Sequence, residues 1–440
     1  MRILYFILKV TLNYSLRAFY PRRGTNNPPK RFLGRTIYVS NHAASFMDPL
    51  VVASLRMPIV FFMTRSDVFN PITKPILWAC QMLPIYRQHD GQDTKGKNEA
   101  VFRKCTRILK WGRNLLIFGE GFTDDTFIRR LKPVKKGAAR IGFSTLEAWN
   151  WNRKIYMCGV GVNYSRPNQS RSDVLISHSD RFCLNDYKEM YLENPSKAIN
   201  EVTKRIEKLM QEQITHVEKK ELAPFHEDIM KLTRRGMNPD NFNRQYSVKQ
   251  RWRYSQDLAK WLNEQDVEEN EALSKLRNDS AGYFKLLKRF KLEEKLIHWK
   301  ISEKGRGKEI LLMILLFPFM PLGVAHLGLP YLLTKRFVEK SFKRKVFWGS
   351  VKVAMGKILM GLLNLPIIWV FYYCVYPSWW AAIGYYFAIG LFGIAAYEWF
   401  LKLKDFKKKG VVQKTDINKF VAKREDLISQ IQDVVPKEFH

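Results

Sequence analysis

The sequence predicts an α/β fold, with a mixed β-sheet flanked by helices, followed by a charged helical region and a C-terminal helical membrane region. Three observations favour this fold class. Short β-rich runs alternate with helical stretches between residues 35 and about 185. Glycine then becomes scarce and charge becomes dense, and beyond residue 310 the chain is lipophilic. We therefore expect four parts in the 440 residues, at 1–30, 31–190, 191–305 and 306–440.

The chain is strongly basic. Lys and Arg total 74 against 41 Asp and Glu, and the formal net charge of +33 requires an anionic partner such as lipid headgroups, nucleic acid or an acidic protein. The sequence has no helix-turn-helix, zinc-finger or RNA-binding signature, and its cations flank hydrophobic runs, so we expect membrane lipids and no nucleic acid as partners. The 14% aromatic content, with 12 Trp, is typical of a membrane interface.

Five cysteines are spaced irregularly and form no C-x-x-C pair. An odd and scattered set is typical of reduced thiols in a protein that faces the cytosol. We therefore expect neither disulfides nor a metal bound by cysteine.

Residues 1–20 predict an amphipathic helix. Apolar side chains from Ile3 to Leu16 fall roughly on one helical face, and the small residues of a signal-peptide cleavage site do not follow. We interpret the segment as an uncleaved helix at the membrane interface, and the alternative is a helix docked on the protein's own core. Residues 24–31, GTNNPPKR, predict a linker.

The part at 31–190 predicts strands that alternate with helices. Runs of β-branched and aromatic residues predict strands at 36–40, 59–63, 83–86, 115–118, 156–164 and 173–177. Helical patterns lie between them, at 49–56, 94–111 and 136–151. This alternation predicts a layered sheet with helices packed against it.

Residues 187–302 predict helices of a different kind. Apolar residues recur at three- and four-residue spacing, as at Ile199, Val202, Ile206 and Leu209. A charged amphipathic stretch of this kind is usually a solvated helical hairpin with a structural role. We assign no chemistry to it.

Two apolar segments, 358–376 and 380–401, are long enough to span the hydrocarbon core of a bilayer. A third, 310–333, is interrupted by prolines. Basic residues crowd both 335–357 and the chain after residue 401, and positive loops stay cytoplasmic. We therefore expect 310–333 to form a re-entrant hairpin, and we expect a multi-pass membrane protein with the part at 31–190 on the cytoplasmic face.

The most informative stretch for chemistry is Asn41–Pro49, NHAASFMDP, which follows a predicted strand. His42 lies where a loop leads into a helix, and Asp48 on the following turn can hold its imidazole in one tautomer. Such a pair can take a proton from an alcohol that attacks a thioester. The alternative is a histidine that only caps the helix.

Two further groups follow predicted strands. Arg87 closes a short strand, at the sheet edge where open sheets bind ligands, and its guanidinium offers a bidentate fork to phosphate. Gly119 and Gly121 flank Glu120 in a tight turn, where glycine allows a ligand to approach the backbone closely.

Two more groups complete the candidate site. Lys135 and Lys136 end a basic cluster that begins at Arg129, for which a solvated face is the usual alternative. Gly159 and Val160 lie in an apolar strand, where a glycine allows close approach of a substrate or of another backbone segment.

Four blocks in this order resemble the glycerol-3-phosphate and 1-acylglycerol-3-phosphate (lysophosphatidic acid) acyltransferase superfamily: Asn41–Pro49, Pro84–Arg87, Phe118–Gly121 and Gly159–Val162. The resemblance covers residues 35 to about 180. Two features depart from the common pattern. Five residues rather than four separate His42 from Asp48, as in a branch that includes some bacterial and fungal glycerol-phosphate acyltransferases and cardiolipin-remodelling relatives. Phe-Gly-Glu-Gly also replaces Phe-Pro-Glu-Gly, which frees the turn around Glu120.

The resemblance implies a role for each candidate residue. His42 would be the general base, Asp48 its orienting partner and Arg87 a phosphate anchor. Gly119, Glu120 and Gly121 would form the acceptor-binding turn. Lys135 and Lys136 would be weaker phosphate contacts, and Gly159 and Val160 would form a wall beside the acyl donor.

The resemblance also implies direct acyl transfer in phospholipid synthesis, without an acyl-enzyme, a metal or a cofactor. The donor would be acyl-CoA or acyl-carrier protein, and the acceptor glycerol 3-phosphate or 1-acyl-glycerol-3-phosphate. Another lysolipid acceptor, in remodelling or as an aminolipid, and a non-catalytic membrane scaffold of the same fold are the alternatives. A scaffold would tolerate the loss of His42 or Asp48, and both are present.

Overall fold

The computed structural model describes residues 2–29, 34–55, 60–71, 73–86 and 94–440. The chain forms two compact units. Residues 1–223 and 244–263 make up the first unit, and residues 224–243 and 264–440 make up the second. The division therefore differs from the boundary expected at residue 190, because helices beyond that residue pack on the sheet of the first unit.

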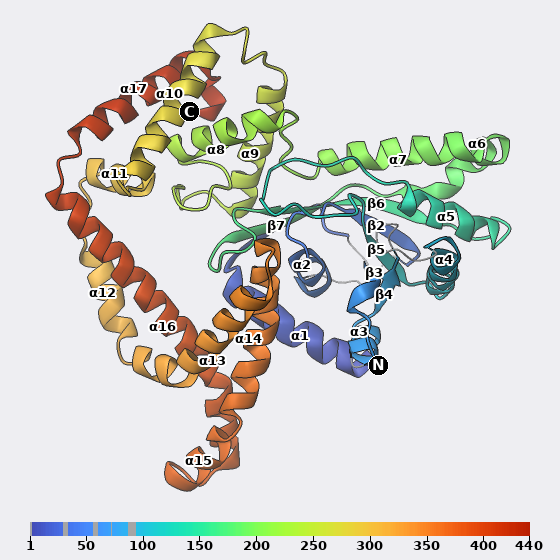
Figure 1. Ribbon diagram of the computed structural model, residues 1–440, viewed down its shortest axis with the longest axis horizontal. Helices are drawn as coiled ribbons and strands as arrows, with labels where there is room; N and C mark the ends of the chain where they lie inside the picture. The colour runs from blue at the N-terminus through green and yellow to red at the C-terminus, as the bar shows by residue number, and fades with distance from the viewer. Residues whose placement is uncertain (1, 30–33, 56–59, 72, 87–93) are drawn as a thin grey trace. The chain divides into compact units, whose positions relative to one another are not determined.

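Among the described residues, eight strands form one mixed sheet in the order β1-β7-β6-β2-β5-β3-β4, with β8 paired to β6. The strands from β2 to β6 run parallel where they pair, β7 runs antiparallel to β6, and β1 runs parallel to β7. The predicted mixed sheet flanked by helices is therefore confirmed (Figure 1). The strands are β1 (Arg22–Asn26), β2 (Thr36–Ser40), β3 (Val60–Arg65), β4 (Met82–Ile85), β5 (Asn114–Phe118), β6 (Tyr156–Tyr164), β7 (Asp173–His178) and β8 (Phe182–Cys183).

Helices cover both faces of this sheet. They are α1 (Arg2–Phe19), α2 (Met47–Leu55), α3 (Thr73–Ala79), α4 (Thr94–Lys110), α5 (Gly137–Glu147), α6 (Lys188–Glu193), α7 (Pro195–Gln211) and α9 (Val248–Asn263). The core of the unit joins α4, α5 and α7 to one face of the sheet, while α2 lies on the other face (Figure 1). The side chains of β2 alternate between the two faces, so Ile37 and Val39 belong to that core.

The six predicted strands and the three predicted helices of this region are confirmed, with shifted ends. The largest shift is in α5, which ends at Glu147 rather than near residue 151. Asn150 and Trp151 adopt positive φ angles of 48° and 61°, a conformation that a right-handed helix cannot contain. All five cysteines are free.

The linker predicted at 24–31 is wrong for its first residues, because 24–26 belong to β1. This strand pairs along its whole length with β7. At its start, Arg22 forms an ion pair with one oxygen of the fully buried Asp173, and Arg251 of α9 lies 2.7 Å from the other oxygen. Backbone pairing and a buried, doubly paired carboxylate override the turn-forming composition of the segment.

Helix α7 lies directly on β6, so the expectation of a solvated hairpin is wrong there, although the helical character is confirmed. Val202 and Ile206, four residues apart, are buried against the sheet. Glycines in β6 make room for the helix and the segment after it. A methyl group added to Gly159 would lie 3.3 Å from the backbone of Met210, and one added to Gly161 would lie 2.0 Å from the Gln213 carbonyl oxygen.

Helix α1 has two apolar faces. Tyr5 and Leu16 are buried in the first unit, whereas Phe6, Ile7 and Val10 are 58%, 50% and 52% exposed. The predicted apolar face therefore divides between docking on the protein and facing outward. Contact of the outward face with a membrane stays a prediction.

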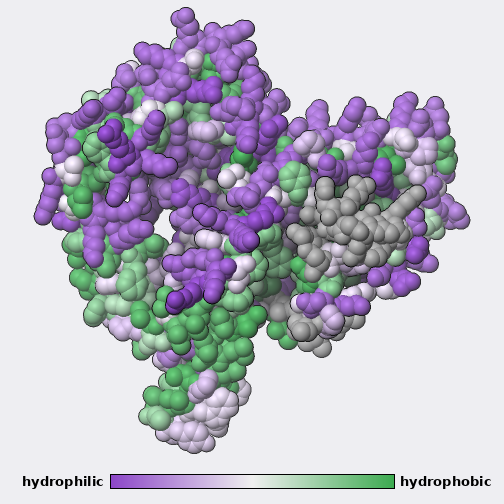
Figure 2. Space-filling view, viewed as in Figure 1, coloured by the Kyte–Doolittle hydropathy of each residue, from purple (hydrophilic) through white to green (hydrophobic). Residues whose placement is uncertain are grey.

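The second unit is helical. Its helices are α8 (Ala223–Leu232), α10 (Glu271–Arg289), α11 (Glu294–Ile301), α12 (Gly307–Leu316), α13 (Met320–Ser341), α14 (Trp348–Asn364), α15 (Ile367–Cys374), α16 (Trp379–Lys414) and α17 (Asn418–Val434). Figure 2 shows hydrophobic residues gathered over α12 to α16, whereas α10 and α17 are mostly hydrophilic.

Two stretches of this unit, Lys345–Cys374 and Trp379–Lys414, are long and apolar enough to cross a membrane. They contain the predicted spans 358–376 and 380–401 almost completely. Helices α12 and α13 meet at an angle of 75°, at a break that contains Pro318. This geometry fits either a broken span or a re-entrant loop, so the re-entrant hairpin stays a prediction.

We expect Gly161→Ala to destabilise the first unit by about 1–3 kcal/mol, because its methyl group must displace the Gln213 carbonyl rather than a flexible side chain. Gly137→Ala is the matched control, since nothing lies within 4 Å of its added methyl group and it starts helix α5. Thermal unfolding of both variants in detergent measures the effect. Equal melting temperatures for the two variants would contradict the close packing of the segment after α7 on β6.

Candidate active site

His42 and Glu120 come together because the parallel strands that precede them, β2 and β5, end at one sheet edge. Ser40 ends β2 and pairs with Phe118 at the end of β5 and with Val160 in β6. His42 follows the first of these strands and Glu120 follows the second. Open α/β sheets bind ligands at such an edge.

His42 and Asp48 form a hydrogen-bonded pair, as the sequence predicts. His42 Nδ1 lies 2.9 Å from Asp48 Oδ2, and Asp48 sits in the first turn of α2. An ionised carboxylate only accepts hydrogen bonds, so Nδ1 carries the proton and Nε2 is left as the basic nitrogen. The imidazole stacks on Phe118 with ring centroids 4.3 Å apart, and 15% of the His42 side chain remains exposed.

Asp48 is fully buried and accepts hydrogen bonds on both oxygens. The backbone N–H of Ala44 donates to Oδ2 at 2.8 Å, beside His42, and the hydroxyl of Tyr164 donates to Oδ1 at 2.8 Å. These donors come from the loop after β2 and from the end of β6. A buried carboxylate needs such donors to compensate for the loss of water.

Asn41 fastens the loop that carries His42 to β6. Its side-chain Oδ1 accepts from the Val162 N–H at 2.8 Å, and its Nδ2 donates to the Val162 carbonyl at 3.1 Å. The buried amide therefore extends the hydrogen bonding between β2 and β6 by one more pair of bonds. These two bonds hold the backbone of the loop next to His42.

The turn after β5 presents Glu120. The Gly121 N–H donates to the Phe118 carbonyl at 3.2 Å, and Gly121 has a φ of 76°, which favours glycine. Gly119 is constrained by close packing instead, since an added methyl group would lie 3.0 Å from the side chains of both Val39 and Val134. The two glycines thus shape the turn rather than expose an open backbone.

Glu120 is 2% exposed and faces the same region as His42. The backbone N–H of His42 donates to its carboxylate, and Lys132 Nζ lies 3.5 Å from Oε2. Burial raises the pKa of Glu120 above its ordinary value of 4.5, while Lys132 and the hydrogen bond from His42 act in the opposite direction.

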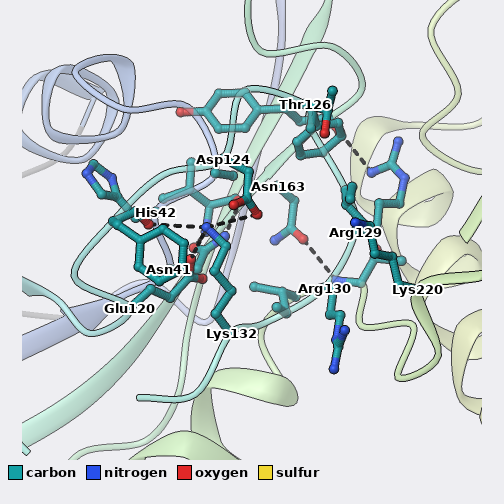
Figure 3. A pocket seen from close by; sticks show the side chains of 18 of the residues that line it. Asn41, His42, Glu120, Asp124, Thr126, Arg129, Arg130, Lys132, Asn163 and Lys220 are labelled. Carbon is teal, nitrogen blue, oxygen red and sulfur yellow. Dashed lines mark hydrogen bonds and ion pairs between the residues drawn. The ribbon is translucent and has the colours of Figure 1, made fainter. Parts of the chain in front are cut away.

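These residues border a cavity of about 440 Å³. Figure 3 shows Lys132 reaching the carboxylates of Glu120 and Asp124, with Arg129, Arg130 and Lys220 farther along the wall. Phe122 and Phe127 add aromatic surface. The lining therefore combines His42, four cations, the three carboxylates of Glu120, Asp124 and Asp125, and some aromatic surface.

The four cations of the cavity, Arg129, Arg130, Lys132 and Lys220, were missed as individual candidates. Arg129 is buried and its Nη1 donates to the Tyr164 carbonyl at 2.8 Å. Lys132 lies 3.1 Å from Asp124 and 4.3 Å from the Phe122 ring centroid. Both belong to the basic cluster that begins at Arg129. Because this cluster has no helical or strand periodicity, the sequence does not show which of its side chains point into the cavity.

Other predicted site residues lie elsewhere. Lys135 and Lys136 are exposed and do not line the cavity, because they follow the loop that has already left it. Gly159 faces α7 and Val160 is fully buried in the sheet, so neither borders the cavity as an acyl-donor wall, and that assignment is not supported. Arg87 lies outside the described residues.

In the part of the chain that the structure describes, no group of three or more His, Cys, Asp or Glu side chains could hold a metal ion. The expectation that the reaction needs no metal and no cofactor stays a prediction.

Residues 22–162 match the family model described as Acyltransferase. The matched segment runs from the start of β1 into β6 and includes His42, Asp48 and Glu120. No curated protein matches the chain significantly.

We expect Glu120→Gln to raise the melting temperature, increasingly so as the pH rises. The pKa of Glu120 is higher in the folded protein than in the unfolded chain. The contribution of Glu120 to the free energy of unfolding is therefore fully present below about pH 4.5 and is lost as the pH rises through the pKa of the folded state. Glutamine does not titrate and avoids this loss. Melting curves from pH 4 to pH 8 measure the difference.

Glu201→Gln is the matched control, since Glu201 is exposed on α7. A Glu120→Gln difference that shrinks with rising pH would show that the ion pair with Lys132 outweighs burial.

Proposed function

Because residues 22–162 form a domain of the acyltransferase family within the glycerolipid acyltransferase superfamily, we propose that the chain is a membrane-bound O-acyltransferase of phospholipid synthesis. It transfers a fatty acyl group from acyl-CoA or acyl-carrier protein to glycerol 3-phosphate or 1-acyl-glycerol-3-phosphate. The observation that carries this proposal is the hydrogen bond between His42 and the buried Asp48, with His42 at the wall of a cavity that four cations and three carboxylates line.

In the proposed reaction His42 is the general base. Its Nε2 takes the proton of the acceptor hydroxyl while the oxygen attacks the thioester carbonyl carbon. The tetrahedral intermediate collapses, the carbon–sulfur bond breaks, and the thiolate recovers the proton from the imidazolium. Asp48 holds the ring in the tautomer that leaves Nε2 free and stabilises the imidazolium that forms. The products are an ester and a free thiol.

The cations of the cavity support a phosphate-bearing acceptor. Arg130, Lys132 and Lys220 line the same space as His42, and phosphate binds such side chains through charge-assisted hydrogen bonds. A volume of about 440 Å³ fits a glycerol-phosphate headgroup, while an acyl chain would have to extend outside it.

The membrane association that we propose is multi-pass, with the catalytic domain on the cytoplasmic face. The two candidate spans and the bent pair of α12 and α13 support it, together with the outward apolar face of α1. Basic residues that flank the spans favour a cytoplasmic position next to anionic lipids. Membrane lipids would then be both the surroundings and the source of acceptor.

We expect His42→Ala to lower kcat about a hundredfold to ten-thousandfold, because the substitution removes the imidazole that takes the proton. Purified protein is assayed with labelled acyl-CoA and acyl-carrier protein against both acceptors, and His440→Ala is the control. If His42→Ala keeps the acyl transfer activity of the wild type, the assigned mechanism is wrong. If the wild type transfers an acyl group to neither acceptor, the assigned substrates are wrong.

We expect Lys132→Ala to raise the KM for the phosphate-bearing acceptor roughly tenfold or more, as loss of one charge-assisted contact implies. Lys136→Ala is the matched control, since Lys136 is exposed at the start of α5 and lies off the cavity. Steady-state kinetics with acceptor varied decides the matter. A larger effect at Lys136 would instead assign phosphate contact to the exposed lysines.

A further inference from the structure

Tyr164 touches the proposed catalytic pair from outside the segment that matches the family. It is the last residue of β6, and the match ends at residue 162. Its side chain is completely buried, and its hydroxyl donates to Asp48 Oδ1 at 2.8 Å. The hydroxyl reaches Asp48 across 116 residues of sequence, so no local motif announces it.

The donors on Asp48 divide between its two oxygens. Oδ2 accepts from the Ala44 N–H and from His42 Nδ1, and Oδ1 accepts from Tyr164. With donors on both oxygens the carboxylate cannot rotate about its Cβ–Cγ bond without breaking a hydrogen bond. Because the carboxylate is fully buried, that loss would leave a polar atom without water or partner.

Tyr164 is itself held on three sides. Its backbone lies in the β6 ladder with β7, opposite Val174. Its carbonyl accepts from Arg129 Nη1 at 2.8 Å, and its ring packs on the Tyr20 ring with centroids 5.7 Å apart. Because Tyr164 is held in one position, its hydroxyl can hold the Asp48 carboxylate in one orientation.

We propose that Tyr164 is a positioning residue for the acyl-transfer reaction, which orients Asp48 so that Asp48 presents His42 in its reactive tautomer and sets the proton affinity of His42. This inference rests on the proposed function. Tyr164 acts only through Asp48 and touches no reacting atom.

The electrostatic effect has a definite sign. Burial and the Asp48 charge raise the pKa of Tyr164 well above its ordinary value, so the hydroxyl remains a donor throughout any practical assay. The hydroxyl dipole offsets part of the Asp48 charge. Without it, the carboxylate attracts the imidazolium more strongly, and the proton affinity of His42 rises.

Other groups around the pair stay unchanged in Tyr164→Phe. They are Tyr20 from α1, Glu120 from the turn after β5, and Arg129, Lys132, Asp124 and Asp125 from the loop that follows.

We expect Tyr164→Phe to lower kcat about tenfold to a hundredfold with little change in acceptor KM, the size associated with losing one hydrogen bond to a charged group. The acid limb of the profile of kcat/KM against pH should move to higher pH. A purely structural loss would lower the rate equally at every pH. The assay uses the full chain in detergent.

Tyr20→Phe is the matched control. Tyr20 is also fully buried and neighbours Tyr164, but its hydroxyl donates to the Pro167 carbonyl instead of to Asp48. We expect a similar loss of thermal stability in both variants, with an unmoved acid limb in Tyr20→Phe. A second measurement replaces Tyr164 alone by 3-fluorotyrosine, whose more acidic hydroxyl is a stronger donor and should move the acid limb to lower pH.

The outcomes separate this inference from the proposed function. If wild-type transfer depends on His42 but both Tyr164 replacements keep the wild-type kcat and acid limb, the positioning role is overturned. An equal shift in Tyr20→Phe would also overturn it. Absence of any His42-dependent transfer in the wild type would overturn the proposed function first. Should Tyr164→Phe fail to fold, the isosteric fluorotyrosine protein decides alone.

Discussion

The candidate site depends on a single buried charge. Asp48 has no contact with solvent, so each of its oxygens needs a hydrogen-bond donor that the protein supplies, and His42 is one of these donors. One donor comes from the loop after β2 and another from the end of β6. The bonds from His42 and Ala44 are local, whereas the bond from Tyr164 requires the end of β6 to lie beside the loop after β2.

Strand β6 serves both faces of the sheet at once. Gly159 and Gly161 admit the backbone of α7 and the segment after it on one face. Val162 and Tyr164, further along the same strand, bind Asn41 and Asp48. The packing of α7 and the position of His42 are therefore coupled through one rigid element, which explains why the helix belongs to the catalytic unit.

Local signals in the sequence predicted much of the fold. Alternating β-rich and helical runs predicted six of the eight strands that the structure describes, all except β1 and β8, and motif order led to His42, Asp48 and Glu120. What failed was long-range. The composition of residues 24–26 indicates a turn, but pairing with β7 decides the outcome. Similarly, the glycines of Gly159–Val162 allow close approach of either a substrate or another backbone segment. Only the structure shows that this neighbour is α7 and the segment after it.

The basic cluster shows the same limit at the site. Its residues stand close together in sequence, and sequence reasoning chose Lys135 and Lys136, whereas Arg129 and Lys132 line the cavity. A loop without a period carries no information about which side chains turn inward. Tyr164 lay beyond reach for another reason, since its partner is 116 residues away.

The division of the chain has a consequence for any attempt to isolate the catalytic part. The polypeptide crosses between the two units three times, at 223/224, 243/244 and 263/264. A stop codon after residue 190 would strip away α7 and leave the apolar face of β6 uncovered in water. A single protease cut after residue 263 would carry 224–243 away from the helices with which they fold. A soluble version would therefore need that excursion replaced by a short designed connection, with α9 retained.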